Sequence, residues 1–391
     1  MKSTQCLFTE EGQDASRVLE EIHSACGTYQ NRHILNSICT EPLDIAKLAY
    51  MEAISTNLGD PRLFPDARNI EINVMKKLGE LLGLPGAVGN AVSGGTEANL
   101  LAMYAAKKRG EERNISSPEV VAPESIHFSV VKAANLLGIR LKLAELDDNF
   151  RAIPSSVNQL ITENTVAVFV TAGTSETGAI DPIAQIAYLC EENDIYLHVD
   201  AASGGYIIPF AKELGYELPE FDFSINGVHS ITVDPHKYGL SVIPSGFILF
   251  RDERLQNYMN FESFFIHTPN HRTFSGTRTG AGVISVYAVM EHLGHKGFRA
   301  MTRHYFKLKD HLIPALTVKG LEILCQPDLN IVMIKSKDPI RAMEELEQRG
   351  WYVSVSKRCH AIRVVLHQHN YPDELSEFAE ILHQIEIGMC M

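Results

Sequence analysis

Ile195-Tyr196-Leu197-His198-Val199-Asp200-Ala201-Ala202 is the stretch of this 391-residue chain that decides the fold. Residues 195–199 are almost continuously apolar or aromatic, which is typical of a short strand buried on both faces of a parallel sheet. Asp200 stands at the carboxyl end of this strand, the edge at which α/β proteins bind their ligands. A carboxylate buried at that edge requires a positively charged partner in order to stay ionised.

A second short motif, Asp234-Pro235-His236-Lys237, supplies a group of the opposite kind. Lys237 follows the apolar runs 223–225 and 230–233, although most lysines are solvated surface groups and Lys237 taken alone could be one. Lys237 and Asp200 together are what chemistry on pyridoxal phosphate (PLP) requires: an amine that forms an imine with the cofactor, and a carboxylate that holds its pyridinium nitrogen. We therefore predict a PLP site with Lys237 and Asp200 as catalytic residues.

A glycine-rich segment, Ser93-Gly94-Gly95-Thr96-Glu97-Ala98-Asn99, opens a predicted helix over residues 97–109. Glycines let backbone N–H groups approach an anion, the helix dipole favours that anion, and Ser93 and Thr96 add hydroxyl donors. The same residues could form only a capping loop with Thr96 as the N-cap. Beside a lysine and an aspartate suited to PLP, we interpret the segment as a phosphate site.

Two further segments are candidate cofactor contacts. His127 precedes a predicted helix over 128–137, and its flat imidazole could stack on the cofactor ring or could be a buried capping residue. The loop 171–181, which contains Thr174, follows the β-branched and aromatic run 166–170. This loop lies at the carboxyl edge of the sheet, so it either contacts the cofactor or simply turns the chain from strand to helix.

Composition and charge exclude several classes of function. The formal net charge of −13 argues against nucleic acid or an anionic membrane surface as a partner. No apolar run approaches the roughly 20 residues of a membrane span, and the N-terminus lacks the apolar core of a signal peptide. The seven cysteines are scattered singly and no helical His-Glu-x-x-His occurs, so we expect neither disulfides nor a metal site. These features predict a cytoplasmic protein that acts on a small molecule.

The alternation of helices and strands predicts an α/β fold. Between residues 51 and 280, expected helices (70–82, 97–109, 128–137, 183–193) alternate with expected strands (120–122, 140–143, 166–170, 195–199, 247–250). This rhythm is typical of a large, mostly parallel, doubly wound domain. Later residues predict a small α+β domain, with helices over 282–293, 299–316, 340–348 and from 372, and strands over 330–334, 351–355 and 361–366. We divide the chain into an N-terminal helical segment (1–50, with a helix over 15–26), a large PLP-binding domain (51–280) and a small C-terminal domain (281–391).

The motifs occur together and in a fixed order: 93–99, 127–129, 173–181, 198–202 and 234–237. In this combination the chain resembles the group II PLP-dependent amino-acid decarboxylases, which share the PLP-dependent transferase-like fold of aspartate aminotransferase (fold type I). Residues 57–65 (NLGDPRLFP) and 275–280 (SGTRTG) are similar to the archaeal L-tyrosine/L-aspartate decarboxylase branch in particular. The likeness extends over nearly the whole chain.

The resemblance implies a role for each matching residue. Lys237 would carry PLP as an imine and Asp200 would pair with the pyridine nitrogen, while Ala202 and His127 would lie against the two faces of the ring. The phosphate would be held by Gly95, Thr96 and His236, and by Gly276 and Thr277 from the neighbouring subunit of a homodimer. Arg278 or Arg363 would contact a substrate carboxylate, for which arginine is well shaped, or would form only a structural ion pair.

The implied reaction is decarboxylation of L-tyrosine to tyramine or of L-aspartate to β-alanine, as in methanofuran or coenzyme A biosynthesis. Such enzymes commonly protonate the product carbanion with a loop tyrosine, but Phe265 stands in that stretch here, which leaves Tyr258 or His267 as donors. A PLP-dependent aldehyde synthase, a carbon–carbon lyase and a non-catalytic PLP-binding protein are the alternatives. Residues that could shape the substrate pocket are Arg32, His33, Arg278 and His267 for charge and Phe64, Phe264 and Phe265 for an apolar slot.

Overall fold

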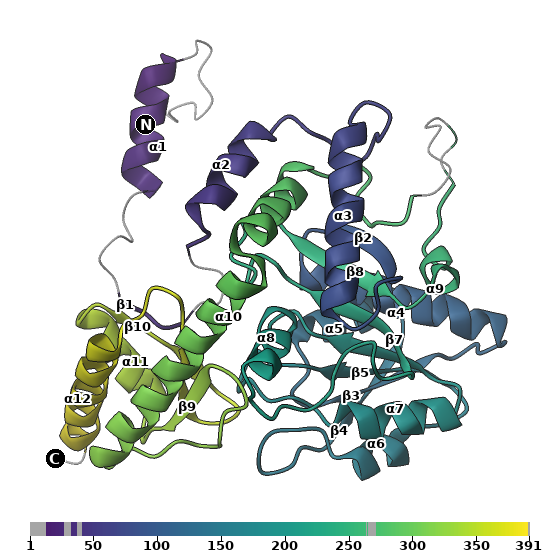
Figure 1. The fold of residues 1–391 in the computed structure, drawn as a ribbon. Coiled ribbons are helices and arrows are strands. Elements are labelled where there is room, and N and C mark those ends of the chain that lie inside the picture. The colour runs from purple at the N-terminus through teal and green to yellow at the C-terminus, as the bar shows by residue number, and fades with distance from the viewer. Residues whose placement is uncertain (1–12, 27–32, 37–40, 263, 265–270, 390–391) are drawn as a thin grey trace, which may run out of the picture.

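A seven-stranded sheet forms the centre of the molecule (Figure 1). The computed structural model describes residues 13–26, 33–36, 41–262, 264 and 271–389. The strands lie in the order β2 (Val88–Val92), β8 (Gly246–Phe250), β7 (Val228–Val233), β6 (Tyr196–Asp200), β5 (Thr165–Thr171), β3 (Glu119–Pro123) and β4 (Arg140–Ala144). Only β8 runs antiparallel to its neighbours. The predicted mostly parallel sheet is therefore confirmed.

Side chains of the central strands alternate between two apolar cores, because successive residues of a strand point to opposite faces. In β5, Val168 and Val170 enter one core and Phe169 enters the other. The first core is covered by α3 (Pro65–Leu81), α6 (Pro154–Leu160), α7 (Ile183–Glu192), α8 (Ile208–Glu213) and the first part of α10 (Ala281–Val318). The second is covered by α4 (Gly95–Glu112), α5 (Phe128–Leu137) and α9 (Glu253–Asn257). Both faces are thus packed by helices, as a doubly wound sheet requires.

Helix α10 connects the central sheet to the C-terminal part of the molecule. The two expected helices, over 282–293 and 299–316, are present as the two halves of α10 (Ala281–Val318), which meet at a kink at Gly294. Gly294 has φ 51° and ψ −174°, a backbone conformation that is open to glycine and strained for other residues. Val283 and Val286 pack on the central core, whereas Leu308 and Leu312 pack in the C-terminal core.

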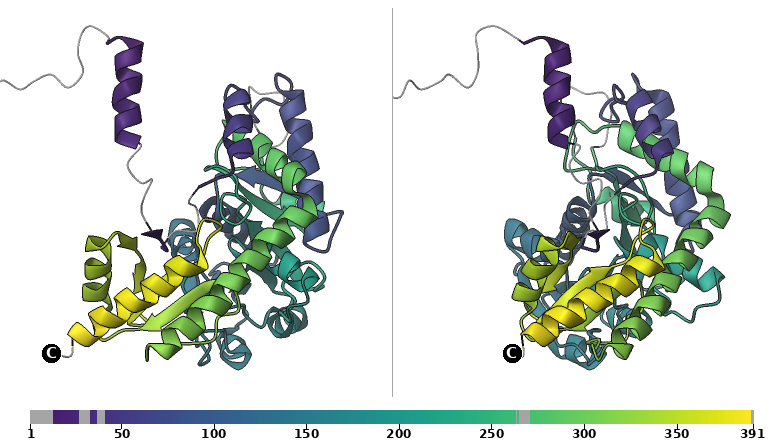
Figure 2. Two further views of the ribbon diagram at one scale, coloured as in Figure 1. Left: turned by 60° about the vertical axis from the view of Figure 1, so that its left-hand side comes forward. Right: turned by 90° about the vertical axis from the view of Figure 1, so that its left-hand side faces the viewer.

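The C-terminal part is a second α/β layer of smaller size. Its antiparallel sheet has the order β11 (Ser354–Ser356), β12 (Ala361–Val365) and β9 (Ile331–Lys335), and it packs with α11 (Pro339–Gln348) and α12 (Pro372–Gly388). Figure 2 shows α12 beside the second half of α10 in both views. The expected strand 351–355 is divided at Val353 into β10 (Trp351–Tyr352) and β11.

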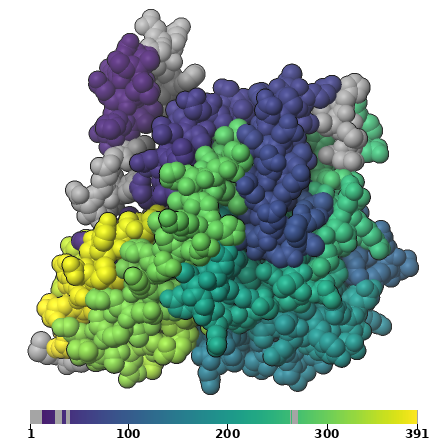
Figure 3. Space-filling model, viewed as in Figure 1, coloured from purple at the N-terminus to yellow at the C-terminus, as the bar shows by residue number. Residues whose placement is uncertain are grey.

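The N-terminal residues contribute to both parts. Helix α1 (Ala15–Cys26) covers the predicted residues and projects from the molecule, as the purple helix of Figure 3 shows. Strand β1 (His33–Ile34) pairs in parallel with β10, which places Leu35 in the C-terminal core. Helix α2 (Asp44–Glu52) lies against α10. Within the described ranges, every helix is too short or too polar to cross a membrane.

Candidate active site

A cavity of about 350 Å³ lies where the carboxyl ends of β5, β6 and β7 meet the first turn of α4. It brings together eight of the predicted residues, which come from four separate segments of the chain: Ser93, Gly95, Thr96, His127, Asp200, Ala202, His236 and Lys237. The cavity therefore occupies the position at which α/β sheets bind ligands.

Asp200 ends β6 and is only 5% exposed. One carboxylate oxygen, Oδ1, accepts the backbone N–H of Ala202 at 3.0 Å, and Oδ2 accepts the side-chain N–H of Asn99 at 2.8 Å. In the described part of the chain, no lysine, arginine or histidine nitrogen lies at ion-pair distance from this carboxylate. Burial without a cation is costly for a carboxylate, so the site is suited to a positively charged ligand atom.

Lys237 lies in the turn that follows β7, with its ammonium 3.5 Å from Oδ2 of Asp234. The same oxygen is 3.6 Å from Nε2 of His236. Asp234 is 2% exposed, and its other oxygen, Oδ1, is buried without a hydrogen-bond partner. Asp234 is therefore a site residue close to both Lys237 and His236, although the sequence motif did not predict a role for it.

The first turn of α4 forms one wall of the cavity. The helix begins at Gly95 with Gly94 as its N-cap, so the alternative in which Thr96 caps the helix is wrong. N–H groups of a first turn lack acceptors within the helix, and they make this end suitable for an anion. A Cβ atom at Gly95 would lie 2.9 Å from Oδ2 of Asp234, so glycine is needed for the close approach. The hydroxyl of Ser93 instead donates to Glu97, at 2.7 Å.

His127 is the N-cap of α5. Its Nδ1 accepts the backbone N–H of Ser129 at 3.3 Å and lies 2.8 Å from the hydroxyl of Ser129. Burial is the main cause that lowers the pKa of His127, so the ring is neutral near pH 7. Because Nδ1 acts as an acceptor, the proton of the neutral ring resides on Nε2.

Three predicted cofactor contacts lie outside this cavity. Thr174 is fully buried inside the loop 171–181, where its hydroxyl bonds that of Thr177 at 2.8 Å. Gly276 and Thr277 line neighbouring hollows of the surface. The position of Gly276 and Thr277 is compatible with contacts to a second subunit, and their role stays a prediction.

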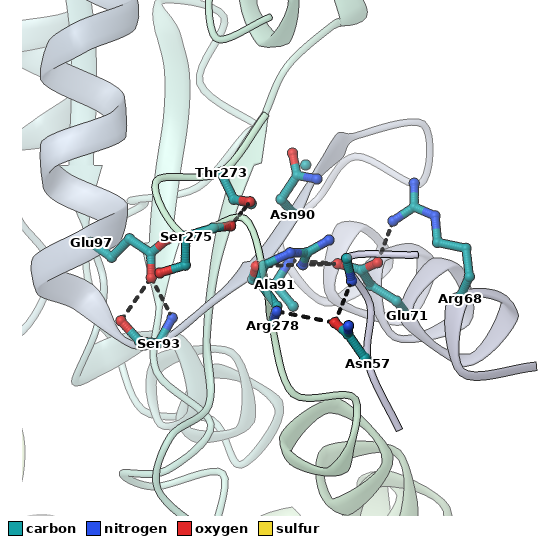
Figure 4. A network of polar contacts seen from close by, with 12 residues as sticks. Asn57, Arg68, Glu71, Asn90, Ala91, Ser93, Glu97, Thr273, Ser275 and Arg278 are labelled. Atoms are coloured by element: carbon teal, nitrogen blue, oxygen red, sulfur yellow. Dashed lines mark hydrogen bonds and ion pairs between the residues drawn. The ribbon is translucent and has the colours of Figure 1, made fainter. Parts of the chain in front are cut away.

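Arg278 forms a buried ion pair close to the cavity (Figure 4). Its Nη1 donates to Oε1 of Glu71 at 2.8 Å and to the carbonyl oxygen of Ala91 at 2.9 Å. Glu71 is fully buried and also pairs with Arg68. Burial by itself would raise the pKa of Glu71, but the two arginines outweigh it and hold the pKa below its ordinary value. Arg278 is thereby fixed next to the strand that leads into Ser93.

Arg363 lies in β12 with a different environment. Its Nη1 donates to the carbonyl oxygen of Asn36 at 3.1 Å and to the hydroxyl of Ser354 at 3.0 Å, and its Nε is buried without a partner. Both partners are neutral, and no carboxylate of the described residues lies at ion-pair distance. Burial lowers the pKa of this guanidinium. Of the two arginines, Arg363 is the one whose charge is not already balanced.

Arg363 is not among the residues that line the cavity, and the other described candidates for substrate or proton contacts do not line it either. The hydroxyl of Tyr258 donates to Glu112 at 2.5 Å. His33 stacks on Trp351 in the C-terminal part, Phe64 packs against the central core, and Phe264 is fully exposed. Arg32, Phe265 and His267 lie outside the described residues.

The residues of the cavity fit PLP. A buried carboxylate without a cation suits the pyridinium, the open first turn of α4 suits the phosphate, and Lys237 lines the same cavity. Five polar residues that were not singled out from the sequence also line it: Asn99, Thr171, Ser175, Ser203 and Asp234. All but Ser203 belong to the motifs described above, but only the folded structure reveals what they contact.

Comparison with known proteins gives a consistent result. Residues 16–336 match the family model "Pyridoxal-dependent decarboxylase conserved domain". The chain is 46% identical over 345 residues to the "Probable L-tyrosine/L-aspartate decarboxylase" of Methanothermobacter thermautotrophicus, covering 88% of this chain and 94% of the relative. It is 38% identical over 385 residues to the "L-aspartate decarboxylase" of Thermococcus kodakarensis, covering 97% and 99%. The sphingosine-1-phosphate lyase of Burkholderia pseudomallei has a TM-score of 0.89 at 24% identity, covering 97% of this chain and 92% of that one, which confirms the predicted fold.

Proposed function

We propose, from the premise that this chain belongs to the pyridoxal-dependent decarboxylase family and is a PLP-dependent amino-acid decarboxylase, that its substrates are L-tyrosine and L-aspartate. The products would be tyramine and β-alanine with CO2. The observation that carries the site assignment is Asp200, a carboxylate 5% exposed on the cavity wall without a cation at ion-pair distance in the described chain. The substrate assignment is supported by the names of the two relatives.

Each residue of the cavity would contribute one part of the chemistry. PLP, when bound, supplies the electron sink that stabilises negative charge at Cα when CO2 leaves. Lys237 would hold the cofactor covalently, and Asp200 would keep a proton on the pyridine nitrogen. The first turn of α4 and His236 would bind the phosphate, and Ala202 and the neutral ring of His127 would enclose the pyridine ring.

Arg363 is the better candidate for the substrate carboxylate. Arg278 already donates to the carboxylate of Glu71, and its release would leave that buried charge with Arg68 alone. Arg363 has only neutral partners and a buried Nε with no acceptor, so a carboxylate would complete its hydrogen bonds. Its side chain would orient the bond that breaks and would not itself transfer a proton.

We further infer that two copies of the chain form a homodimer in the cytoplasm. A hollow of about 590 Å³ lined mainly by apolar residues lies beside Gly276, and Phe274 next to it is 74% exposed. Large exposed apolar surface of this kind is typical of subunit interfaces. Sedimentation equilibrium would show a dimer at assay concentration, and an active monomer would contradict this arrangement.

The test of the function is a turnover assay on the purified, PLP-loaded protein. L-Tyrosine and L-aspartate are supplied separately, and amine, aldehyde and CO2 are quantified together. The control pair is Lys237→Ala and Lys142→Ala, because both lysines pair with a carboxylate and are similarly buried, at 17% and 16% side-chain exposure. We expect CO2 and amine from wild type and Lys142→Ala only. Aldehyde in place of amine would support an aldehyde synthase, and no CO2 above the Lys237→Ala background would refute both substrates.

A further inference from the structure

Asn99 lies at the wall of the cavity and at the centre of a buried hydrogen-bond network. It is 1% exposed and its side-chain amide contacts four other side chains. Nδ2 donates to Oδ2 of Asp200 at 2.8 Å and to the hydroxyl of Ser129 at 2.9 Å. Oδ1 accepts from Thr232 at 3.0 Å and lies 3.0 Å from Nε2 of His198. All donors and acceptors of this amide are therefore in use.

The buried side chains behind Asn99 agree with the orientation of the amide, in which Nδ2 faces the carboxylate of Asp200. The hydroxyl of Tyr196 donates to Ser230, which leaves the proton of Ser230 free for Nδ1 of His198. His198 then carries its proton on Nε2, which makes it a donor to Oδ1 of Asn99. Burial lowers the pKa of His198 to about 4, in agreement with a neutral ring. A flipped amide would place Oδ1 against the carboxylate of Asp200, so only the observed orientation satisfies every contact.

The near side of the network extends to His127. Ser129 accepts the N–H of Asn99, so the proton of its own hydroxyl is available to Nδ1 of His127, 2.8 Å away. This donor and the backbone N–H of Ser129 both require Nδ1 to be unprotonated. The Ser129 hydroxyl is therefore one of two donors that hold His127 in the Nε2–H tautomer, and it is the one whose direction depends on Asn99.

We propose that Asn99 is a positioning residue that couples Asp200 to His127, through Ser129, and so influences with one amide both the carboxylate that would pair with the pyridine nitrogen and the tautomer of the histidine that would face the ring. The inference rests on the proposed roles of Asp200 and His127. Asparagine suits this position because the amide offers two donors on one side and an acceptor on the other, whereas a carboxylate has no donor. The buried network behind Asn99 keeps the amide from turning.

Asn99→Asp tests the coupling because it keeps the shape of the side chain and reverses its hydrogen bonding. The introduced carboxylate would take the proton of Ser129, so Nδ1 of His127 would lose its hydroxyl donor and become protonated. It would also place a second negative charge against Asp200. The first readout is 15N NMR of histidine-labelled apoprotein, with the His127 signals assigned from a His127→Gln sample. The second readout is the Kd for PLP.

We expect wild type to show His127 as the Nε2–H tautomer and Asn99→Asp to show protonated Nδ1, with PLP bound about tenfold or more weakly. Asn370→Asp is the matched control, because Asn370 is also buried (3% exposed) but lies in the C-terminal part away from the cavity. It should lower stability and change neither readout. The inference is wrong if Asn99→Asp leaves both readouts at wild-type values, or if Asn370→Asp moves them equally.

Ser129→Ala removes the connection from Asn99 to His127 and leaves the contact between Asn99 and Asp200 in place. This variant tests the coupling even if Asn99→Asp does not fold. Only the backbone donor, at 3.3 Å, would then hold Nδ1 of His127, so a second tautomer should appear while the Kd for PLP stays within about twofold of wild type. An unchanged His127 spectrum in this variant would refute the coupling. The NMR readout needs no turnover: a wild-type protein that releases no CO2 would defeat the proposed function and leave the Asn99 result intact.

Discussion

At the scale of single residues, Asp200 and Arg363 share one property: each is a buried charge whose described partners are neutral. Proteins seldom leave a buried charge in this state, because its desolvation is costly. Glu71 shows the ordinary solution, since two arginines balance it. This contrast supports our proposal that Asp200 and Arg363 bind charged groups of the cofactor and the substrate.

Asp200→Asn should keep the fold and lose most of the activity. The amide can still accept from Asn99 or Ala202 but cannot hold a positive charge on the pyridine nitrogen. We expect kcat to fall by about 10²- to 10³-fold, the usual cost of removing one preorganised electrostatic contact. Steady-state kinetics with saturating PLP measures this, and circular dichroism verifies the fold. A kcat near that of wild type would remove Asp200 from its proposed role.

Arg363→Gln should raise KM by about ten- to a hundredfold, because hydrogen bonds to a charged group contribute about 1.5–3 kcal/mol. Arg251→Gln is the control. Arg251 also donates only to neutral acceptors, the carbonyl oxygens of Val228, Phe223 and Ile225, but it lies away from the cavity. Its variant should lose stability without a change in KM. Equal effects of the two substitutions on KM would argue against substrate binding by Arg363.

At the scale of helices and strands, Gly294 is the position where the backbone itself makes a prediction. Its φ of 51° with ψ of −174° is strained for any residue with a Cβ, although no atom lies near enough to clash with one. Gly294→Ala should therefore cost about 1–3 kcal/mol of the free energy of unfolding, measured by urea denaturation. Gly388→Ala, in the last turn of α12 and with ordinary φ, should cost nothing. Equal stabilities of the two variants would contradict the claim that the backbone at Gly294 is strained for other residues.

Elements with a strong local signal were predictable from the sequence, and those defined by tertiary contacts were not. The run 166–170 gave β5 because β-branched residues fill both faces of a buried strand. β2 has the sequence Val88-Gly-Asn-Ala-Val92, whose glycine and asparagine disfavour a strand; it forms because β8 pairs with it along its full length. We expected a non-helical connection between residues 293 and 299, but only Gly294 is non-helical, because the residues on both sides of it adopt helical conformation.

The same distinction between local sequence signals and tertiary contacts applies to the candidate site. The motifs identified the segments that meet at the cavity, because each has residue types that PLP chemistry needs. They could not reveal that Ser93 is engaged by Glu97, that Arg278 is engaged by Glu71, or that Asn99 joins Asp200 to Ser129. Those contacts join residues up to 207 positions apart, and their geometry exists only in the folded chain. The division of the chain at 50 and 280 stays a prediction.

At the scale of the whole molecule, buried histidines should make the protein sensitive to mild acid. Burial lowers the pKa of His198 and His229 to about 4 and that of His367 to about 3, from 6.5 in the unfolded chain. Between these values the unfolded chain binds the extra protons, so stability falls as the pH falls. Burial of Asp181 raises its pKa to about 6, and this single group acts in the opposite direction.

The net difference near pH 5 is close to two protons, or roughly 2–3 kcal/mol lost per pH unit. Calorimetry of the apoprotein at fixed concentration should therefore give a lower Tm at pH 5 than at pH 7. His229→Asn removes one of the three protons, so its Tm should fall less over the same interval. A Tm that is constant or higher at pH 5 would show that these histidines are not buried in the neutral form.

The parallel pairing of β1 with β10 has a consequence for the synthesis of the protein. His33 pairs with Trp351, so β1 leaves the ribosome 318 residues before its partner strand. At about 5–20 residues per second, the nascent chain would spend roughly 15–60 s without it. During that interval Leu35, which is fully buried in the finished protein, has no core to enter. The layer that contains β10 can therefore fold completely only when a segment made much earlier is still free to join it.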